Sequence, residues 1–103
     1  MKPNREVATR SDIRSEKVLS DAIAAVTKPD EIHALLIDLC TPAELQALAD
    51  RWNVVLQLQA GKAYRTIQAE TGVSVTTIGR VARCLNQGAG GYHAALSALA
   101  ETE

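Results

Sequence analysis

Apolar residues recur every three to four positions along most of the chain, which is the spacing of one face of an α-helix. A first helix is predicted over residues 12–26, with Ser11 as its N-cap. Its apolar positions are Val18, Leu19, Ala22, Ile23 and Val26. A second helix is predicted from Pro29, a residue that suits the first helical position, to about Cys40. It ends there because Pro42 disfavours helical backbone at the residue before it.

The clearest helix start in the chain is Thr41-Pro42-Ala43-Glu44. It combines a hydroxyl at the cap, proline at the first helical position, and a carboxylate three residues on that can bond back to the cap amide. A long helix is predicted from there to Gly61, a natural C-cap. Its apolar positions cover more than one face: Leu45, Leu48, Ala49, Trp52, Val54, Val55, Leu56 and Leu58. A short monomer covers such a helix poorly, so the pattern favours a dimer.

Residues 64–86 have the pattern of a helix-turn-helix. Two helices, 64–71 and 75–86, flank Gly72, which can adopt the positive φ of a tight turn. Ser74 is predicted to cap the second helix. Four apolar side chains are expected to form a small core between the helices: Ile67, Val73, Ile78 and Val81.

A last helix is predicted over about 92–100, after a flexible glycine-rich link that contains Gly88, Gly90 and Gly91. Residues 1–10 are predicted to be a mobile arm, and residues 11–103 a single domain. The prediction is thus an all-α fold of about six helices. Composition agrees: the chain is 47% hydrophobic but only 3% aromatic, so its core is built from Leu, Ile, Val and Ala.

The length of the chain and the placement of its cysteines argue against several classes of protein. A chain of 103 residues is too short for a two-domain enzyme, and no nucleophile has a catalytic context. The two cysteines, Cys40 and Cys84, and the two histidines, His33 and His93, show no metal-ligand spacing. No apolar run is long enough to cross a bilayer. We expect a soluble cytoplasmic protein with no metal, no membrane partner and no catalytic site.

Charge is informative through its position rather than its total, because the net charge is only −1. The segment from Gly61 to His93 contains four basic residues and a single acidic residue, Glu70, which gives a local excess of three positive charges. The second helix of the motif begins with small residues, as a helix entering a major groove requires. The expected DNA-binding residues are Lys62, Arg65, Gln68, Ser74, Val75, Thr76, Thr77, Arg80 and Arg83.

Two other interpretations remain open at this stage. A glycine turn and a capped helix also occur in any αα-corner without a DNA-binding role. Near-neutral net charge is also compatible with a helical dimer that serves as a protein-interaction scaffold. Salt dependence of binding to random duplex would separate such a scaffold from a DNA-binding regulator.

The segments TPAELQALADRW and TGVSVTTIGRVARCLNQGAGGY resemble the Trp operon repressor family, in particular its YerC/YecD-type branch. The resemblance covers about Leu39 to Tyr92. It implies an intertwined all-α homodimer whose two helix-turn-helix heads bind double-stranded DNA at a palindromic operator. It further implies a transcriptional regulator, and a repressor. Arg65 is similar to the arginine of the family that reaches into the groove.

The resemblance also implies an effector site, with Thr41, Arg51, Arg80, Val81 and Cys84 as its candidate residues. Arg51 and Arg80 are similar to the two arginines that sandwich the indole of L-tryptophan in amino-acid-responsive members. Those members have a glycine where this chain has Val81, and a serine where it has Cys84. Overfilling a packed site costs about 1–3 kcal/mol. This argues against L-tryptophan as the effector and leaves another small-molecule corepressor open.

Overall fold

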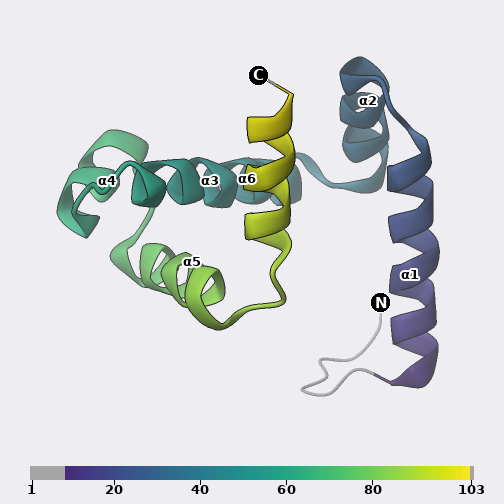
Figure 1. Cartoon of the computed structure of the whole chain (residues 1–103), viewed down its shortest axis with the longest axis horizontal. Helices are drawn as coiled ribbons and strands as arrows, with labels where there is room; N and C mark the ends of the chain where they lie inside the picture. Colours follow the sequence, from purple (N-terminus) through teal and green to yellow (C-terminus); the bar gives the residue numbers. More distant parts are fainter. Residues whose placement is uncertain (1–8, 103) are drawn as a thin grey trace. The chain divides into compact units, whose positions relative to one another are not determined.

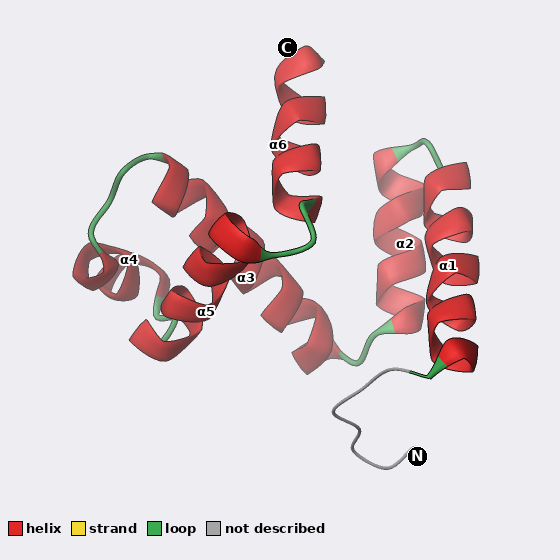
Figure 2. Cartoon of the chain, turned by 60° about the horizontal axis from the view of Figure 1, so that its bottom comes forward, coloured by secondary structure: helices red, strands yellow, loops and turns green. Residues whose placement is uncertain are grey.

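A computed structural model describes residues 9–102 of the chain. Within that range the fold is all-α, as predicted, and has no β-strand (Figure 2). The helices are α1 (Arg10–Ala25), α2 (Pro29–Leu39), α3 (Pro42–Gln59), α4 (Tyr64–Thr71), α5 (Val75–Gln87) and α6 (Gly91–Glu101). The chain divides into two compact units, one up to Thr41 and one from Pro42 onward, and each is described by itself.

Helix α1 begins two residues earlier than predicted, and its N-cap is Thr9 rather than Ser11. The Thr9 hydroxyl accepts a hydrogen bond from the Asp12 amide at 3.1 Å, and the Asp12 carboxylate accepts one from the Thr9 amide at 3.1 Å. Ser11 has Arg14 three residues on, which cannot make this reciprocal pair. Within the predicted arm, Thr9 is therefore the N-cap and Arg10 is helical, and residues 1–8 lie outside the described residues.

The first unit is an antiparallel pair of helices with an exposed apolar surface. Helices α1 and α2 run in opposite directions and are joined by a short link (Figures 1 and 2). No described residue of either helix is buried. Val18 is 64% exposed, Ile37 53% and Leu39 50%. Two helices with this much apolar surface in water need a partner surface to cover it.

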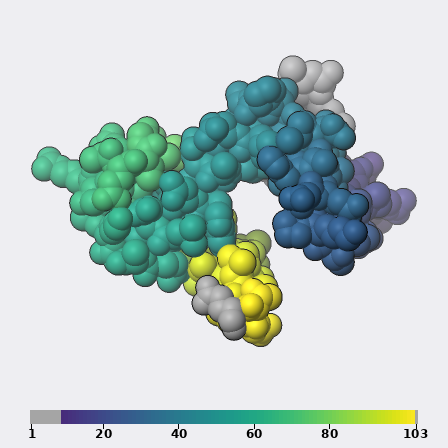
Figure 3. All heavy atoms as spheres, turned by 90° about the horizontal axis from the view of Figure 1, so that it is seen from above, coloured from purple at the N-terminus to yellow at the C-terminus, as the bar shows by residue number. Residues whose placement is uncertain are grey.

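The second unit is built on a buried apolar core where α3, α4 and α5 meet. The predicted core residues Ile67, Val73, Ile78 and Val81 are all buried, together with Val54 and Val55 of α3. In the space-filling view α3 and α4 form one continuous mass (Figure 3). The core attaches the predicted helix-turn-helix segment to the long helix α3.

The turn between α4 and α5 has a defined geometry. Gly72 is in the left-handed region, with φ of +76°, as its place in the turn predicts. The Thr71 hydroxyl donates to the Ile67 carbonyl at 2.6 Å and accepts a hydrogen bond from the Val73 amide at 3.1 Å. These bonds hold Val73 over the core and fix the direction in which α5 begins.

Ile67 is the side chain through which α4 enters the core, and it is 0% exposed. We expect Ile67→Ala to lower the free energy of unfolding of the full chain by about 2–5 kcal/mol, because it leaves a cavity at the meeting point of three helices. Urea denaturation measures the change. The control is Thr66→Ala, at an exposed position on the same helix, which should change it by no more than about 0.5 kcal/mol. Equal losses in the two variants would contradict this description of the core.

Candidate nucleic-acid interface and the adjoining pocket

The N-terminus of α5 is capped, and its first two side chains are exposed. The Ser74 hydroxyl accepts a hydrogen bond from the Thr77 amide at 3.2 Å, as the predicted cap requires. Val75 is 44% exposed, and Thr76 is exposed as well. A small apolar group and a methyl-bearing hydroxyl therefore lie at the outer end of the helix, free to contact the edges of base pairs.

Thr77 does not lie outward as expected. It is half-buried, lines a pocket on the inner side of α5, and its hydroxyl accepts a hydrogen bond from the Ser74 hydroxyl at 3.1 Å. The reason is helical geometry: Thr77 shares a face with Arg80, Val81 and Cys84, which follow at three, four and seven residues. The outward pair is thus Val75 and Thr76.

The predicted cations differ in what they contact. Lys62 forms an ion pair with Glu70 at 2.7 Å, so the one acid of this segment neutralises it. Arg65 and Gln68 are exposed on α4, and Arg80 and Arg83 are exposed on α5. Within the described part of the chain, none of these arginines is ion-paired. The local excess of positive charge therefore resides in three arginines.

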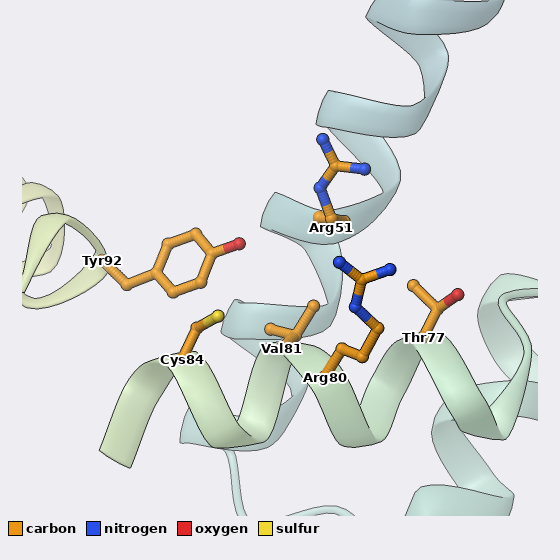
Figure 4. Close-up of a pocket in the computed structure, with 6 residues that line it drawn as sticks. All are labelled: Arg51, Thr77, Arg80, Val81, Cys84 and Tyr92. Carbon is orange, nitrogen blue, oxygen red and sulfur yellow. The ribbon is translucent and has the colours of Figure 1, made fainter. Parts of the chain in front are cut away.

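A pocket of about 330 Å³ lies between α3, α5 and α6. It is lined by Arg51 of α3, by Thr77, Arg80, Val81 and Cys84 of α5, and by Tyr92 of α6 (Figure 4). Four of the five candidate effector residues are thus brought together: Arg51, Arg80, Val81 and Cys84. The lining does not include Thr41, which belongs to the first unit. With two guanidinium groups at one wall, the pocket suits an anionic or aromatic group.

Sequence reasoning did not find Tyr92 as a residue of this pocket. Its ring projects from α6 toward Cys84 and Val81 (Figure 4) and lies 6.3 Å, centroid to centroid, from the ring of Trp52. Tyr92 and Trp52 both pack against the core. The pairing depends on the turn between α5 and α6, which the helical periodicity of either helix does not specify.

The family model described as Trp repressor protein matches residues 14–100. The chain belongs to the Trp repressor family. The uncharacterized protein YerC of Bacillus subtilis is 42% identical over 85 residues, which cover 82% of each chain. This confirms the resemblance to the YerC-type branch of the family.

Two solved structures of Trp-repressor-like proteins share the fold. A TrpR-like protein from Eubacterium eligens matches with a TM-score of 0.77 and 33% identity, covering 84% of this chain and 90% of that one. A candidate Trp repressor from Staphylococcus aureus matches with a TM-score of 0.77 and 35% identity, covering 84% of this chain and 86% of that one. The Trp repressor fold therefore extends over most of this chain.

Within this Trp repressor fold, no helix in the described range is both long and apolar enough to cross a membrane. The same residues contain no group of three His, Cys, Asp or Glu side chains that could hold a metal ion. Cys40 and Cys84 are free thiols.

Val81 lines the pocket beside Arg51 and Arg80, the two residues between which the family resemblance would place the indole of L-tryptophan. It is 1% exposed and packs in the core, so its side chain cannot rotate aside to admit a ring without opening the core. We expect millimolar L-tryptophan to leave the melting temperature of the unmodified protein unchanged. Val81→Ala, which removes the branch but keeps the helix, should give a measurable rise with the same ligand. Heat of L-tryptophan binding at micromolar concentration in the unmodified protein, measured by calorimetry, would contradict this.

Proposed function

We propose that this protein is a DNA-binding transcriptional regulator, acting in the cytoplasm as a repressor, that reads a palindromic operator as a homodimer. The observation that carries the proposal is the exposed Val75–Thr76 pair at the capped start of α5, on a corner fixed by a buried core. Family membership supports the same function.

The first turn of α5 carries the side chains that contact the bases. A helix that enters a major groove with its N-terminus forward brings its first side chains to the base edges. Val75 can contact a thymine methyl group, and Thr76 can combine a methyl contact with a hydrogen bond to a base edge. The half-buried Thr77 lies behind this surface and, with Ser74, keeps the first turn in shape.

The arginines around that turn contact the phosphates. Arg65 and Gln68 are exposed on α4, the helix that crosses the backbone in this mode of docking. Arg80 and Arg83 follow on α5. Because the three arginines have no acidic partner in the described part of the chain, each can neutralise a phosphate without breaking an ion pair. Lys62 would first have to leave Glu70, so we assign it a smaller part.

A second copy of the chain is the partner that the first unit requires. Helices α1 and α2 bury no described residue and present Val18, Ile37 and Leu39 to solvent. Leu48 and Leu56 of α3 are also more than 40% exposed. An isologous dimer covers this surface and places the two α5 helices in related positions about a two-fold axis. Half-sites are then expected one helical turn, about 10–10.5 base pairs, apart.

Arg65→Ala and Thr76→Ala test the division between affinity and specificity. We expect Arg65→Ala to weaken binding to the selected and the random duplex alike and to lower the slope of log affinity against log salt by about one, since it removes a phosphate contact. Thr76→Ala should relax the preference at one base pair and change affinity for random duplex little. Fluorescence anisotropy with a duplex selected from a random library by the unmodified protein, and with random duplex, measures both.

Lys28→Ala, a charge removed from the first unit, is the matched control for Arg65→Ala and should leave binding unchanged. Affinity that falls steeply with salt in the unmodified protein supports DNA binding. Absence of duplex binding at low salt would contradict the proposal and favour a protein-interaction scaffold.

We expect the full chain to be a dimer at micromolar concentration, because the apolar surface of α1 and α2 is too large to remain in water. Sedimentation equilibrium gives the mass directly. Val18→Glu together with Ile37→Glu should shift the chain toward monomer, whereas Ala24→Glu together with Ala34→Glu, at exposed positions of the same two helices, serves as the charge-matched control. A folded, soluble monomer in the unmodified protein would overturn the dimer.

A further inference from the structure

Helix α6 reaches the pocket through a turn whose backbone only glycine accommodates. A Cβ at Gly88 would collide with the carbonyl group of Cys84, and Gly90 has a φ of +89°. The predicted flexible link is thus a specific turn. It places Tyr92 at the second position of α6, directly against α5.

Three contacts then hold the first turn of α6 against α3 and α5, at the place where these two helices pack together. The Tyr92 ring packs against Trp52 of α3 and lines the pocket beside Val81 and Cys84 of α5. His93 donates from Nε2 to the Leu85 carbonyl of α5 at 2.6 Å. Each helix of the junction is therefore contacted by the first turn of α6.

We propose that Tyr92 is a positioning residue for DNA reading: its ring, held by the Gly88–Gly90 turn, braces α5 against α3 and so sets the direction of the helix that carries Val75 and Thr76. The inference rests on the proposed function for its consequence, and on the geometry of α3, α5 and α6 for the brace itself. Because the brace is part of the chain, α5 is held without a bound small molecule.

The ring, rather than the hydroxyl, carries this role. Among the hydrogen bonds of the described residues none involves the Tyr92 hydroxyl, whereas the ring contacts Trp52 and the core. Tyr92→Phe keeps the ring and removes the hydroxyl. Tyr92→Ala removes both, and leaves Ile78 and Val81, with the partly buried Leu85, as the side chains of α5 that pack in the core.

Hydrogen exchange of the full chain tests the brace without DNA. We expect the amides of Val75–Gln87 to exchange about tenfold faster in Tyr92→Ala, and at the unmodified rate in Tyr92→Phe. Gly90→Ala, whose Cβ meets open space but whose φ of +89° is strained, should speed the same amides. Leu99→Ala, at a 51% exposed position of α6, is the control and should not change them.

The DNA readout uses the duplex that the unmodified protein selects. Apparent affinity falls by the fraction of molecules whose α5 is correctly placed, so Tyr92→Ala should bind about tenfold more weakly. The slope of affinity against salt should stay the same, because the arginines are intact. If Tyr92→Ala fails to fold, Tyr92→Leu replaces it under the same criteria.

Unchanged α5 exchange in Tyr92→Ala, or equal defects in Tyr92→Phe and Tyr92→Ala, would overturn the brace. Such a result leaves the proposed function standing if the unmodified protein binds duplex. Conversely, if the unmodified protein binds no duplex, the proposed function fails, and the exchange rates still decide whether Tyr92 braces α5.

Discussion

Burial of six apolar side chains where α3, α4 and α5 meet is the constraint on which the rest of the second unit depends. Val54 and Val55 come from α3, Ile67 from α4, Val73 from the turn, and Ile78 and Val81 from α5. Because these side chains interdigitate, the crossing of α4 and α5 cannot change without opening the core. The direction of the exposed first turn of α5 is therefore a property of the core.

Core and surface are separated on α5 by helical periodicity. Ile78 and Val81 face the core, and Thr77, Arg80, Val81 and Cys84 line the pocket. Val75 and Thr76 remain outside both. This one helix of thirteen residues thus contributes side chains to the core, to the wall of the pocket and to the candidate DNA-binding surface. A substitution at Val81 affects two of these functions, since it belongs to the core and to the wall.

Sequence reasoning predicted the elements of this fold well because their ends carry local chemical signals. Pro29, Pro42, Gly72 and Ser74 all mark helix ends as the structure has them. Thr9, and not the predicted Ser11, caps α1, because both are good caps and only the partner Asp12 decides between them. The spacing of Thr77 with Arg80 and Cys84 could have placed Thr77 on the inner face.

What the sequence did not reveal depends on contacts between distant segments. Apolar residues occur on every face of α3, so the periodicity of its sequence does not identify Val54 and Val55 as its fully buried pair. The ion pair that neutralises Lys62 is formed with Glu70, which lies eight residues further along the chain, beyond a turn. Tyr92 reaches the pocket only through the glycine turn after α5. Each of these needs the packing of helices, which a pattern along one helix does not contain.

Chemical-shift mapping of the isotope-labelled full chain during titration with a selected duplex tests the central claim most directly. The claim is that the corner formed by α4 and the first turn of α5 contacts DNA. We expect the largest amide shifts at Arg65, Gln68 and residues 74–77, with little change in α1 and α2. Shifts concentrated on α1, α2 or the C-terminal half of α6, with residues 74–77 unaffected, would contradict it.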